Sequence, residues 1–261
     1  MKKILSLTLA FACVCTSAQN ITNKIVIDQF GYRPSAKKTA VIRNPQTGFD
    51  SNESFSPGST YEVINAENKE VIYSGSIIAW NSGAENTSSG DKAWWFDFSS
   101  LSTPGAYYIY DPTNDVKSYT FNIAENVYEE ALKHAVRAFF YQRSGHEKAT
   151  QYAGLYWSDN ASHLGNLQDL NCRKYDSSNN VSTELDVHGG WYDAGDYNKY
   201  SIWTANYIIE LLRAYQENPN IWTDDYNIPE SGNGTPDLID EVKWGLDHLL
   251  RLQLTDGSII S

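Results

Sequence analysis

Two aspartates, Asp193 and Asp196, lie three positions apart in the stretch GGWYDAGDYNKY, residues 189–200. A carboxylate can accept a proton from water and so act as a general base. Aromatic rings pack against flat apolar faces such as those of a pyranose. The stretch carries four of them, which we predict to bind substrate: Trp191, Tyr192, Tyr197 and Tyr200. Together these residue types indicate a site that cleaves a sugar.

Glycines surround the two acids, and their backbone freedom suits a sharp turn. The three are Gly189, Gly190 and Gly195. Loops rich in acids and glycines also bind calcium, because that ion prefers hard oxygen ligands. The aromatic residues favour a sugar site, but the spacing alone leaves both interpretations open.

The chain begins with MKKILSLTLAFACVCTSAQN, which has the features of a secretory signal. Lys2 and Lys3 form the positive start, an apolar run follows, and we predict cleavage after Ala18. The residues before Cys13 fit a lipid anchor poorly. No later stretch is apolar for long enough to span a bilayer, so we predict a secreted or periplasmic protein without a membrane anchor.

Composition limits the classes of partner. The formal net charge is −12, which argues against nucleic acid and anionic membranes and is compatible with a neutral polysaccharide. The eighteen tyrosines and eight tryptophans agree with a sugar partner, although many must belong to a core. Removal of the signal leaves Cys172 as the one cysteine, so no intrachain disulfide can form.

Short strands dominate the first half of the mature chain. Seven segments are rich in β-branched and aromatic residues: 24–27, 40–42, 61–64, 71–73, 94–98, 106–109 and 119–123. This number and spacing predict an all-β sandwich of immunoglobulin type over residues 19–123. We expect it to support the fold rather than to bind sugar, because it contains no cluster of acids.

Helical periodicity begins at Asn126, so we place a domain boundary near residue 124. Three helices are predicted: one from Asn126 to about residue 144, one over 202–215 and one from Thr235 to about residue 255. Residues 145–188 show little periodicity. The second helix is apolar nearly all round, which predicts burial on most of its sides. Since three helices cannot cover it, we expect the chain to be a fragment or to be completed by another chain.

The acidic stretch and NIPESGNGTPDLIDEVKWGLDHLLRLQ (227–253) together closely resemble glycoside hydrolase family 9. DQFGYRP (28–34) resembles the start of the immunoglobulin-like domain that precedes the catalytic domain in one branch of that family. FYQRSG (140–145) is similar to the end of the first catalytic helix. The resemblance implies a β-sandwich followed by an all-α (α/α)6 barrel, with residues 124–261 forming the first, incomplete part of that barrel.

The family consists mostly of endoglucanases that hydrolyse β-1,4-glucans with inversion. The resemblance implies that Asp196 is the base and that Asp193 helps to hold the same water. The general acid of the family is a glutamate near the far end of the barrel, and no residue here matches it. Glu230 and Glu241 belong to the family's helical motif and are not assigned this role. We therefore expect the 261 residues alone to be inactive and the full-length protein to act as a monomer.

Several relatives carry a structural zinc held by cysteines and histidines. The matching places here are read as Ser144, Cys172–Arg173 and Tyr192, so we predict no zinc and assign no metal ligand. His163 and His188 are expected to have surface or supporting roles. Calcium is common in the family, but these residues do not reveal its position. No cofactor is required for the chemistry itself.

Two other functions stay open. One is a relative that acts on oligosaccharides from one end, or on a mixed-linkage or xyloglucan backbone. The other is a non-catalytic protein that only binds carbohydrate. Loops that block one end of a cleft would decide the first alternative, and most of them are absent from this stretch. Indifference of binding to a change at Asp196 would favour the second.

Overall fold

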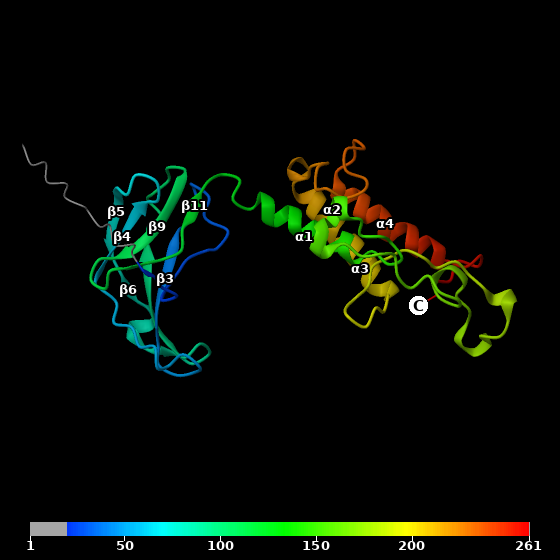
Figure 1. Ribbon diagram of the computed structural model, residues 1–261, viewed down its shortest axis with the longest axis horizontal. Helices are drawn as coiled ribbons and strands as arrows, with labels where there is room; N and C mark the ends of the chain where they lie inside the picture. Colours follow the sequence, from blue (N-terminus) through cyan, green and yellow to red (C-terminus); the bar gives the residue numbers. More distant parts are fainter. Residues whose placement is uncertain (1–19, 261) are drawn as a thin grey trace, which may run out of the picture. The chain divides into compact units, whose positions relative to one another are not determined.

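The computed structural model describes residues 20–260 (Figure 1). The chain divides into two compact units, one up to Tyr128 and one from Glu129 onward. The sequence places this division near residue 124, at the end of the last predicted strand. The predicted signal, residues 1–18, lies outside the described residues.

The first unit is a sandwich of two sheets (Figure 1). One sheet has the order β1-β10-β9-β4-β5, with β11 also pairing with β9, and the other has the order β2-β3-β8-β6, with β7 also pairing with β8. The first sheet contains β1 (Asn20–Ile21), β4 (Thr60–Asn65), β5 (Val71–Ser76), β9 (Gly105–Asp111), β10 (Val116–Lys117) and β11 (Phe121–Ile123). The second contains β2 (Ile25–Val26), β3 (Thr39–Pro45), β6 (Ile78–Ala79), β7 (Glu85–Asn86) and β8 (Asp91–Asp97). The predicted immunoglobulin-like sandwich is confirmed.

Alternation of side chains along the strands builds the core of this unit. Tyr61 and Val63 on β4 and Phe96 on β8 are fully buried, while Thr60 and Glu62 on β4 and Trp95 and Asp97 on β8 are exposed or half-buried. The buried hydroxyl of Tyr61 donates to the Asp111 carboxylate (2.9 Å), so the polar group of this core tyrosine is satisfied. All seven predicted segments contain a strand. The four strands that were not predicted, β1, β6, β7 and β10, have two residues each, too few to form a pattern.

The second unit is helical. It contains α1 (Glu129–Gln142), α2 (Thr150–Trp157), α3 (Ser201–Glu217) and α4 (Asp237–Leu252), with short 3₁₀ turns between them. Three of these helices were predicted. The fourth, α2, was missed because it has eight residues and is interrupted at Gly154, whose φ is +72°. Among the described residues, no helix has both the length and the apolar character that crossing a membrane requires.

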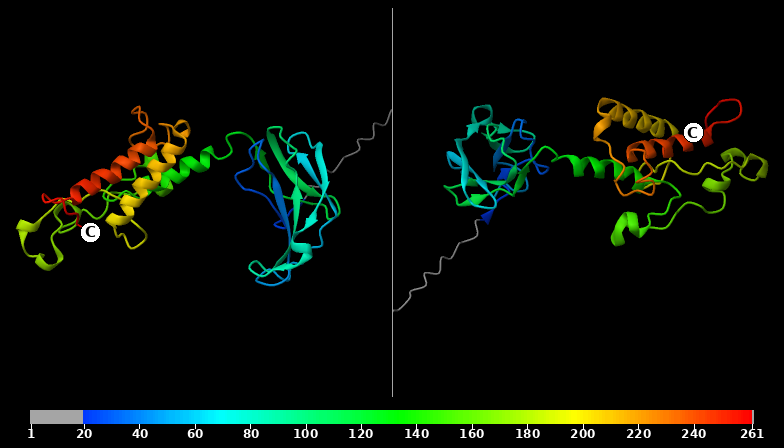
Figure 2. Two further views of the ribbon diagram at one scale, coloured as in Figure 1. Left: turned by 180° about the vertical axis from the view of Figure 1, so that it is seen from behind. Right: turned by 90° about the horizontal axis from the view of Figure 1, so that it is seen from above.

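Helix α3 is less buried than predicted. It packs against α4 (Figure 2), and its buried side chains, such as Ile208 and Leu211, face that helix and its surroundings. Ile202 is 71% exposed and Trp203 45% exposed. The prediction of burial on most sides is therefore wrong for the described residues, because only one side of α3 meets another helix of this unit.

Candidate active site

The end of α1 and the helix α4 together fix the path of the acidic stretch. Ser144 N–H donates to the carbonyl of Gly190 (2.9 Å), and Tyr192 N–H donates to the carbonyl of Gln142 (2.9 Å). The indole N–H of Trp244, on α4, donates to the same carbonyl of Gly190 (2.9 Å). The backbone that leads into Asp193 is therefore tied to two helices before it reaches the acid.

Gly190 is required at its position for two reasons. Its φ is +73°, a conformation that side chains other than glycine rarely adopt. A Cβ there would also lie 2.4 Å from the ring of His248, a side chain that is 1% exposed. Burial lowers the pKa of His248 to about 4, so this ring is neutral. It packs directly against the backbone of Gly190.

The two aspartates lie on one tight turn, as predicted. Tyr197 N–H donates to the carbonyl of Ala194 (3.1 Å), and Asp193 N–H donates to the carbonyl of Asn198 (2.9 Å), which closes the turn. The sequence predicted that Gly189, Gly190 and Gly195 provide the backbone freedom for this turn, and this is wrong for Gly195. Gly195 does not have a positive φ, whereas Tyr197 does, at +60°. Strained backbone of this kind is often found at functional sites.

The two carboxylates have different surroundings. Asp196 is exposed, and its Oδ2 accepts a hydrogen bond from Asn198 Nδ2 (2.8 Å), which also lies 3.2 Å from the hydroxyl of Tyr200. Asp193 is half-buried and lines a cavity of about 140 Å³ with Trp191 and other side chains. The turn therefore presents one oriented, solvent-accessible carboxylate beside a second, more sheltered one.

Only two of the four aromatic side chains have an accessible ring. Trp191 is 3% exposed, and its indole donates to Glu241 Oε2 (3.2 Å); Tyr192 is 7% exposed. Their burial does not fit the prediction that they pack against sugar, because other side chains already cover their rings. Tyr197 and Tyr200 are 54% and 44% exposed, so their rings can contact a ligand.

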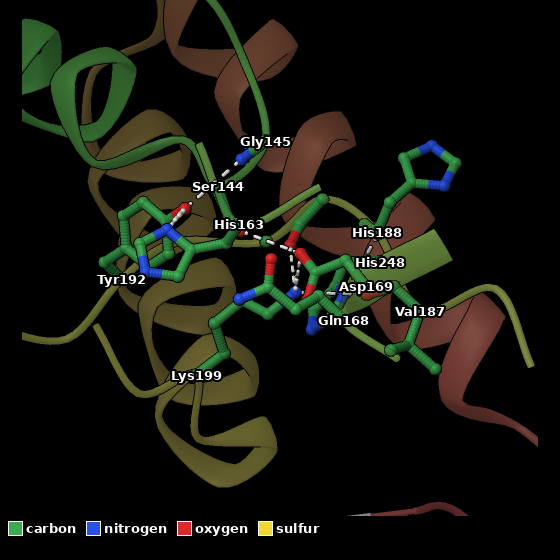
Figure 3. A network of polar contacts seen from close by, with 12 residues as sticks. Ser144, Gly145, His163, Gln168, Asp169, Val187, His188, Tyr192, Lys199 and His248 are labelled. Atoms are coloured by element: carbon green, nitrogen blue, oxygen red, sulfur yellow. Dashed lines mark hydrogen bonds and ion pairs between the residues drawn. The ribbon is translucent and has the colours of Figure 1, made fainter. Parts of the chain in front are cut away.

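A cluster of three rings, of which Figure 3 shows His163 and Tyr192, braces the turn from the side. The ring of His163 lies 4.9 Å from that of Tyr197 and 5.1 Å from that of Tyr192, and these two tyrosine rings lie 5.2 Å apart. Nδ1 of His163 is 2.9 Å from the Tyr192 hydroxyl and 2.9 Å from the hydroxyl of Ser162. Like Tyr197, His163 has a positive φ, of +61°. No pattern in the sequence indicated this contact, since His163 is thirty residues from the turn.

If Asp196 is the general base that the family resemblance implies, replacement of His163 by alanine is expected to lower kcat about 10- to 100-fold, because loss of this support lets the acidic turn shift by a fraction of an ångström or more. KM should change much less, since His163 contacts the turn from the side. Steady-state kinetics of the full-length protein measure both constants. His134→Ala, on the exposed face of α1, is the control. An unchanged kcat for His163→Ala would show that the ring cluster does not position the turn.

Lys199 fixes the far side of the acidic stretch. Its ammonium group donates to the carbonyls of Val187 and Gly189 (3.1 Å each) and forms an ion pair with Asp169 (2.7 Å), which also accepts from Ser144 Oγ (3.0 Å; Figure 3). Both ends of the stretch are therefore held. A cavity of about 310 Å³ adjoins this side and is lined by residues that include Tyr197, Asn198, Lys199 and His248.

Arg143, at the end of α1, binds both glutamates of the helical motif. The fully buried guanidinium contacts Glu230 Oε1 and Glu241 Oε1 (3.0 Å each) and stacks over the ring of Trp244 at 4.7 Å. Burial raises the pKa of Glu241 to about 7, although Arg143 and the indole of Trp191 oppose this shift by favouring the ionised carboxylate. The two glutamates raise the pKa of Arg143 against the effect of its own burial. Both carboxylates are therefore engaged with Arg143 inside the helical unit.

The places matched to a zinc site are only partly brought together. Ser144 and Tyr192 lie near each other at the end of α1, but Cys172 is a half-buried free thiol whose backbone pairs with Leu185. The residues that contact the Tyr192 hydroxyl are instead Ser162 (3.2 Å) and His163. The pairing of Cys172–Arg173 with this place is therefore wrong.

Three aspartates of the second unit form a group that could hold a cation. Oxygen atoms of Asp224, Asp237 and Asp240 lie within 4.8 Å of one another. Asp237 is fully buried, and its Oδ1 has no hydrogen-bond partner, although Oδ2 accepts from Tyr226 N–H (2.5 Å) and Ser231 Oγ (2.8 Å). Burial, reinforced by the neighbouring carboxylates, raises the pKa of Asp237 and of Asp240. An orphaned oxygen among crowded acids fits a hard cation such as calcium.

Sequence reasoning missed this group. Asp237 and Asp240 stand on α4 within the recognised motif, but Asp224 lies before it. Its carboxylate accepts from the backbone N–H groups of Gly232 and Gly234 (2.6 Å each). The glycine pair of the motif was the available signal, because amides exposed in such a loop require an acceptor.

Comparison with known families matches both units. Residues 128–260 match the family described as Glycosyl hydrolase family 9, and residues 20–115 match the cellulase N-terminal Ig-like domain. The two matches follow the order of the sandwich and the helical unit along the chain.

Individual relatives agree with these matches. A xyloglucan-specific endo-β-1,4-glucanase of Bacteroides ovatus is 31% identical over 94% of this chain and 39% of its own length, and a cellulose 1,4-β-cellobiosidase of Acetivibrio thermocellus is 31% identical over 88% of this chain and 27% of its own length. Among solved structures, the one titled Bacteroides ovatus GH9 gives a TM-score of 0.73 at 30% identity, covering 89% of this chain and 40% of that protein. The chain thus spans about two fifths or less of the length of these relatives.

Proposed function

The chain belongs to glycosyl hydrolase family 9, and from that membership we propose that the protein is a secreted enzyme that hydrolyses β-1,4-glucosidic bonds in cellulose or a related β-glucan with inversion. The similar proteins from Bacteroides ovatus and Acetivibrio thermocellus, which are described as acting on xyloglucan and cellulose, support this class of substrate. The observation that carries the proposal is the exposed, oriented carboxylate of Asp196 beside Asp193 on one turn.

Asp196 is proposed to act as the general base. Its carboxylate takes a proton from a water molecule whose oxygen attacks the anomeric carbon, while the bond from that carbon to the departing sugar oxygen breaks. Asp193 is proposed to accept a hydrogen bond from the same water and so to fix its direction of attack. The hydrogen bond from Asn198 aims the Asp196 carboxylate, and Tyr197 and Tyr200 have ring faces free to pack against the sugar.

The general acid must protonate the departing oxygen from the opposite side, roughly 6.5–9.5 Å from the base in an inverting enzyme. Glu230 and Glu241 are unsuited, because Arg143 engages both carboxylates. We assign the acid to none of the described residues. We therefore propose that the 261-residue chain by itself releases no sugar from carboxymethylcellulose, whereas the full-length protein does.

Stereochemistry tests this function. We expect proton NMR of cellohexaose hydrolysis by the full-length protein to show the α-anomer at the new reducing end before mutarotation. A β-anomer as the first product would refute the inverting mechanism. Reducing-sugar assays of the 261-residue chain on carboxymethylcellulose accompany this measurement. If the 261-residue chain releases sugar and Asp196→Asn abolishes this release, the proposal that the chain by itself is inactive is refuted.

Two alternatives predict different products, viscosity changes and retention on cellulose. An enzyme that works from one end, or on oligosaccharides only, would release a single short product and leave the viscosity of a soluble glucan almost unchanged. A non-catalytic binding protein would be retained on cellulose without product, and Asp196→Ala would not alter that retention. The family membership favours hydrolysis, and product profiles over time distinguish the first alternative.

We also propose that Asp224, Asp237 and Asp240 hold a structural calcium ion, and that no zinc occupies the region of Ser144 and Tyr192. A bound divalent cation would supply positive charge that offsets the mutual repulsion of the three carboxylates. The unpartnered Oδ1 of Asp237 supports this assignment, as does the raised pKa of Asp237 and Asp240.

Calcium at 100 times its Kd is expected to raise the free energy of unfolding by about 2.7 kcal/mol. Thermal unfolding of the chain with calcium chloride or with a chelator measures the shift, and calorimetric titration with calcium gives the Kd. Asp237→Asn should remove the calcium response. Asp225→Asn, an adjacent aspartate outside the group, should keep it. A calcium response that persists unchanged in Asp237→Asn would exclude this site.

A further inference from the structure

A row of apolar side chains crosses the outer face of the second sheet of the sandwich. The strand register places Val26 opposite Val41, Val41 opposite Trp95, and Trp95 opposite Ile78, so the row spans β2, β3, β8 and β6. Val26 is 45% exposed, Trp95 43% and Ile78 68%. Side chains of this kind on an outer face lie in water at a cost in solubility, which marks the face as a candidate binding surface.

The row leads into a groove of about 270 Å³ around Trp95. Polar and charged side chains share it with the indole: the lining residues are Lys37, Thr39, Ser76, Ile78, Trp95 and Asp97. Thr39 lies opposite Asp97 in the strand register, two positions along from the apolar row on each strand. The groove therefore offers one broad aromatic surface with hydrogen-bonding groups along its border.

The charges of the groove favour an uncharged ligand. One lysine and one aspartate line it, so it presents neither a cationic nor an anionic field. Asp97 is also held in place, since its Oδ1 accepts from Ser99 N–H (2.8 Å) and its carbonyl accepts from the Tyr73 hydroxyl (3.1 Å). A preformed groove loses little conformational entropy when a ligand binds.

We propose that this groove binds a neutral β-glucan chain, with one glucose ring packed on the indole of Trp95 and its hydroxyl groups bonded to the polar border. A β-1,4-linked glucose has equatorial hydroxyls at its edge and an apolar face, which match the border and the indole. Only the choice of polymer rests on the proposed function. This assigns the sandwich a binding role, where the sequence indicated structural support alone.

Titration of the 261-residue chain with cellohexaose tests the groove. The indole N–H signal of Trp95, assigned by its absence from Trp95→Phe, is expected to shift saturably in nitrogen–proton NMR spectra. Trp95→Ala, which lacks this signal, should raise the Kd read from the backbone N–H signals of Thr39 and Asp97 about 10- to 30-fold, as expected when roughly half of a tryptophan side chain is no longer buried. Trp95→Tyr, which keeps an aromatic ring, should raise it less.

Tyr119→Ala is the matched control, because Tyr119 is an exposed aromatic residue that does not line the groove. It should bind like the unaltered chain. A Trp95 signal that does not shift, or a Kd unchanged in Trp95→Ala, overturns the proposal. Hydrolysis of cellotetraose by the full-length protein is measured separately. A shifted Trp95 signal in a protein that hydrolyses nothing would uphold the groove and refute the proposed function.

Discussion

Asp196→Ala is expected to lower kcat of the full-length protein on β-glucan by about 10²–10⁴-fold, the contribution that a general base usually makes. KM should change little, because the carboxylate acts on water and not on the bound sugar in the ground state. Release of reducing sugar from xyloglucan and carboxymethylcellulose measures both constants. Asp193→Ala is expected to cost less, since a misdirected water can still be deprotonated.

Asp247→Ala is the control for this experiment, because Asp247 is an aspartate on α4 that forms an ion pair with exposed Lys243. It should retain full activity. Thermal unfolding of each variant separates a chemical effect from a loss of folded protein. A folded Asp196→Ala protein with more than a tenth of the original kcat would refute the assignment of the base. Asp193 would then become the candidate.

Arg143→Met is expected to lower the free energy of unfolding by about 3–5 kcal/mol. The substitution removes the guanidinium and leaves the fully buried carboxylate of Glu241 without its cation. Domains are stable by only about 5–15 kcal/mol, so much of the stability of the helical unit would be lost. Denaturant unfolding followed by tryptophan fluorescence measures the change, since Trp191 and Trp244 both contact this network.

A second substitution identifies the cause of that loss. Arg143→Met combined with Glu241→Gln removes the unpaired charge and should recover part of the stability. Arg213→Met, which breaks an exposed pair with Glu210 on α3, should change it by less than about 1 kcal/mol. Equal losses in the single and the double variant would mean that packing of the long side chain, and not its charge, supports the unit.

The sandwich could be predicted from the sequence because its strands alternate between buried and exposed side chains, as in Tyr61 and Val63 of β4. The helices α1, α3 and α4 have sufficient length for a helical period to appear. Helix α2 does not, and Gly154 interrupts it. The periodicity of α3 showed that its faces are apolar nearly all round, and the small number of predicted helices indicated that they could not all be covered. It did not show which face would meet α4.

The candidate site could be predicted only where it is local in sequence. Asp193 and Asp196 were found because one short stretch contains them both. His163, Arg143 and Asp224 reach the site or its supports from distant segments, and no spacing rule connects them. The sequence also did not reveal which aromatic side chains of the stretch are buried. Trp191 and Tyr200 are both aromatic and nine residues apart, yet one lies in the core and the other has an accessible ring.

The carbonyl of Gly190 accepts hydrogen bonds from both Ser144 N–H and the indole of Trp244. Its bond from Ser144 joins two main-chain groups, which most exchanges of side chain leave intact. Related proteins could therefore diverge widely around this point and still deliver the acidic turn along the same route. Residue 190 itself is constrained, because its backbone conformation and the nearby ring of His248 permit glycine and exclude larger residues.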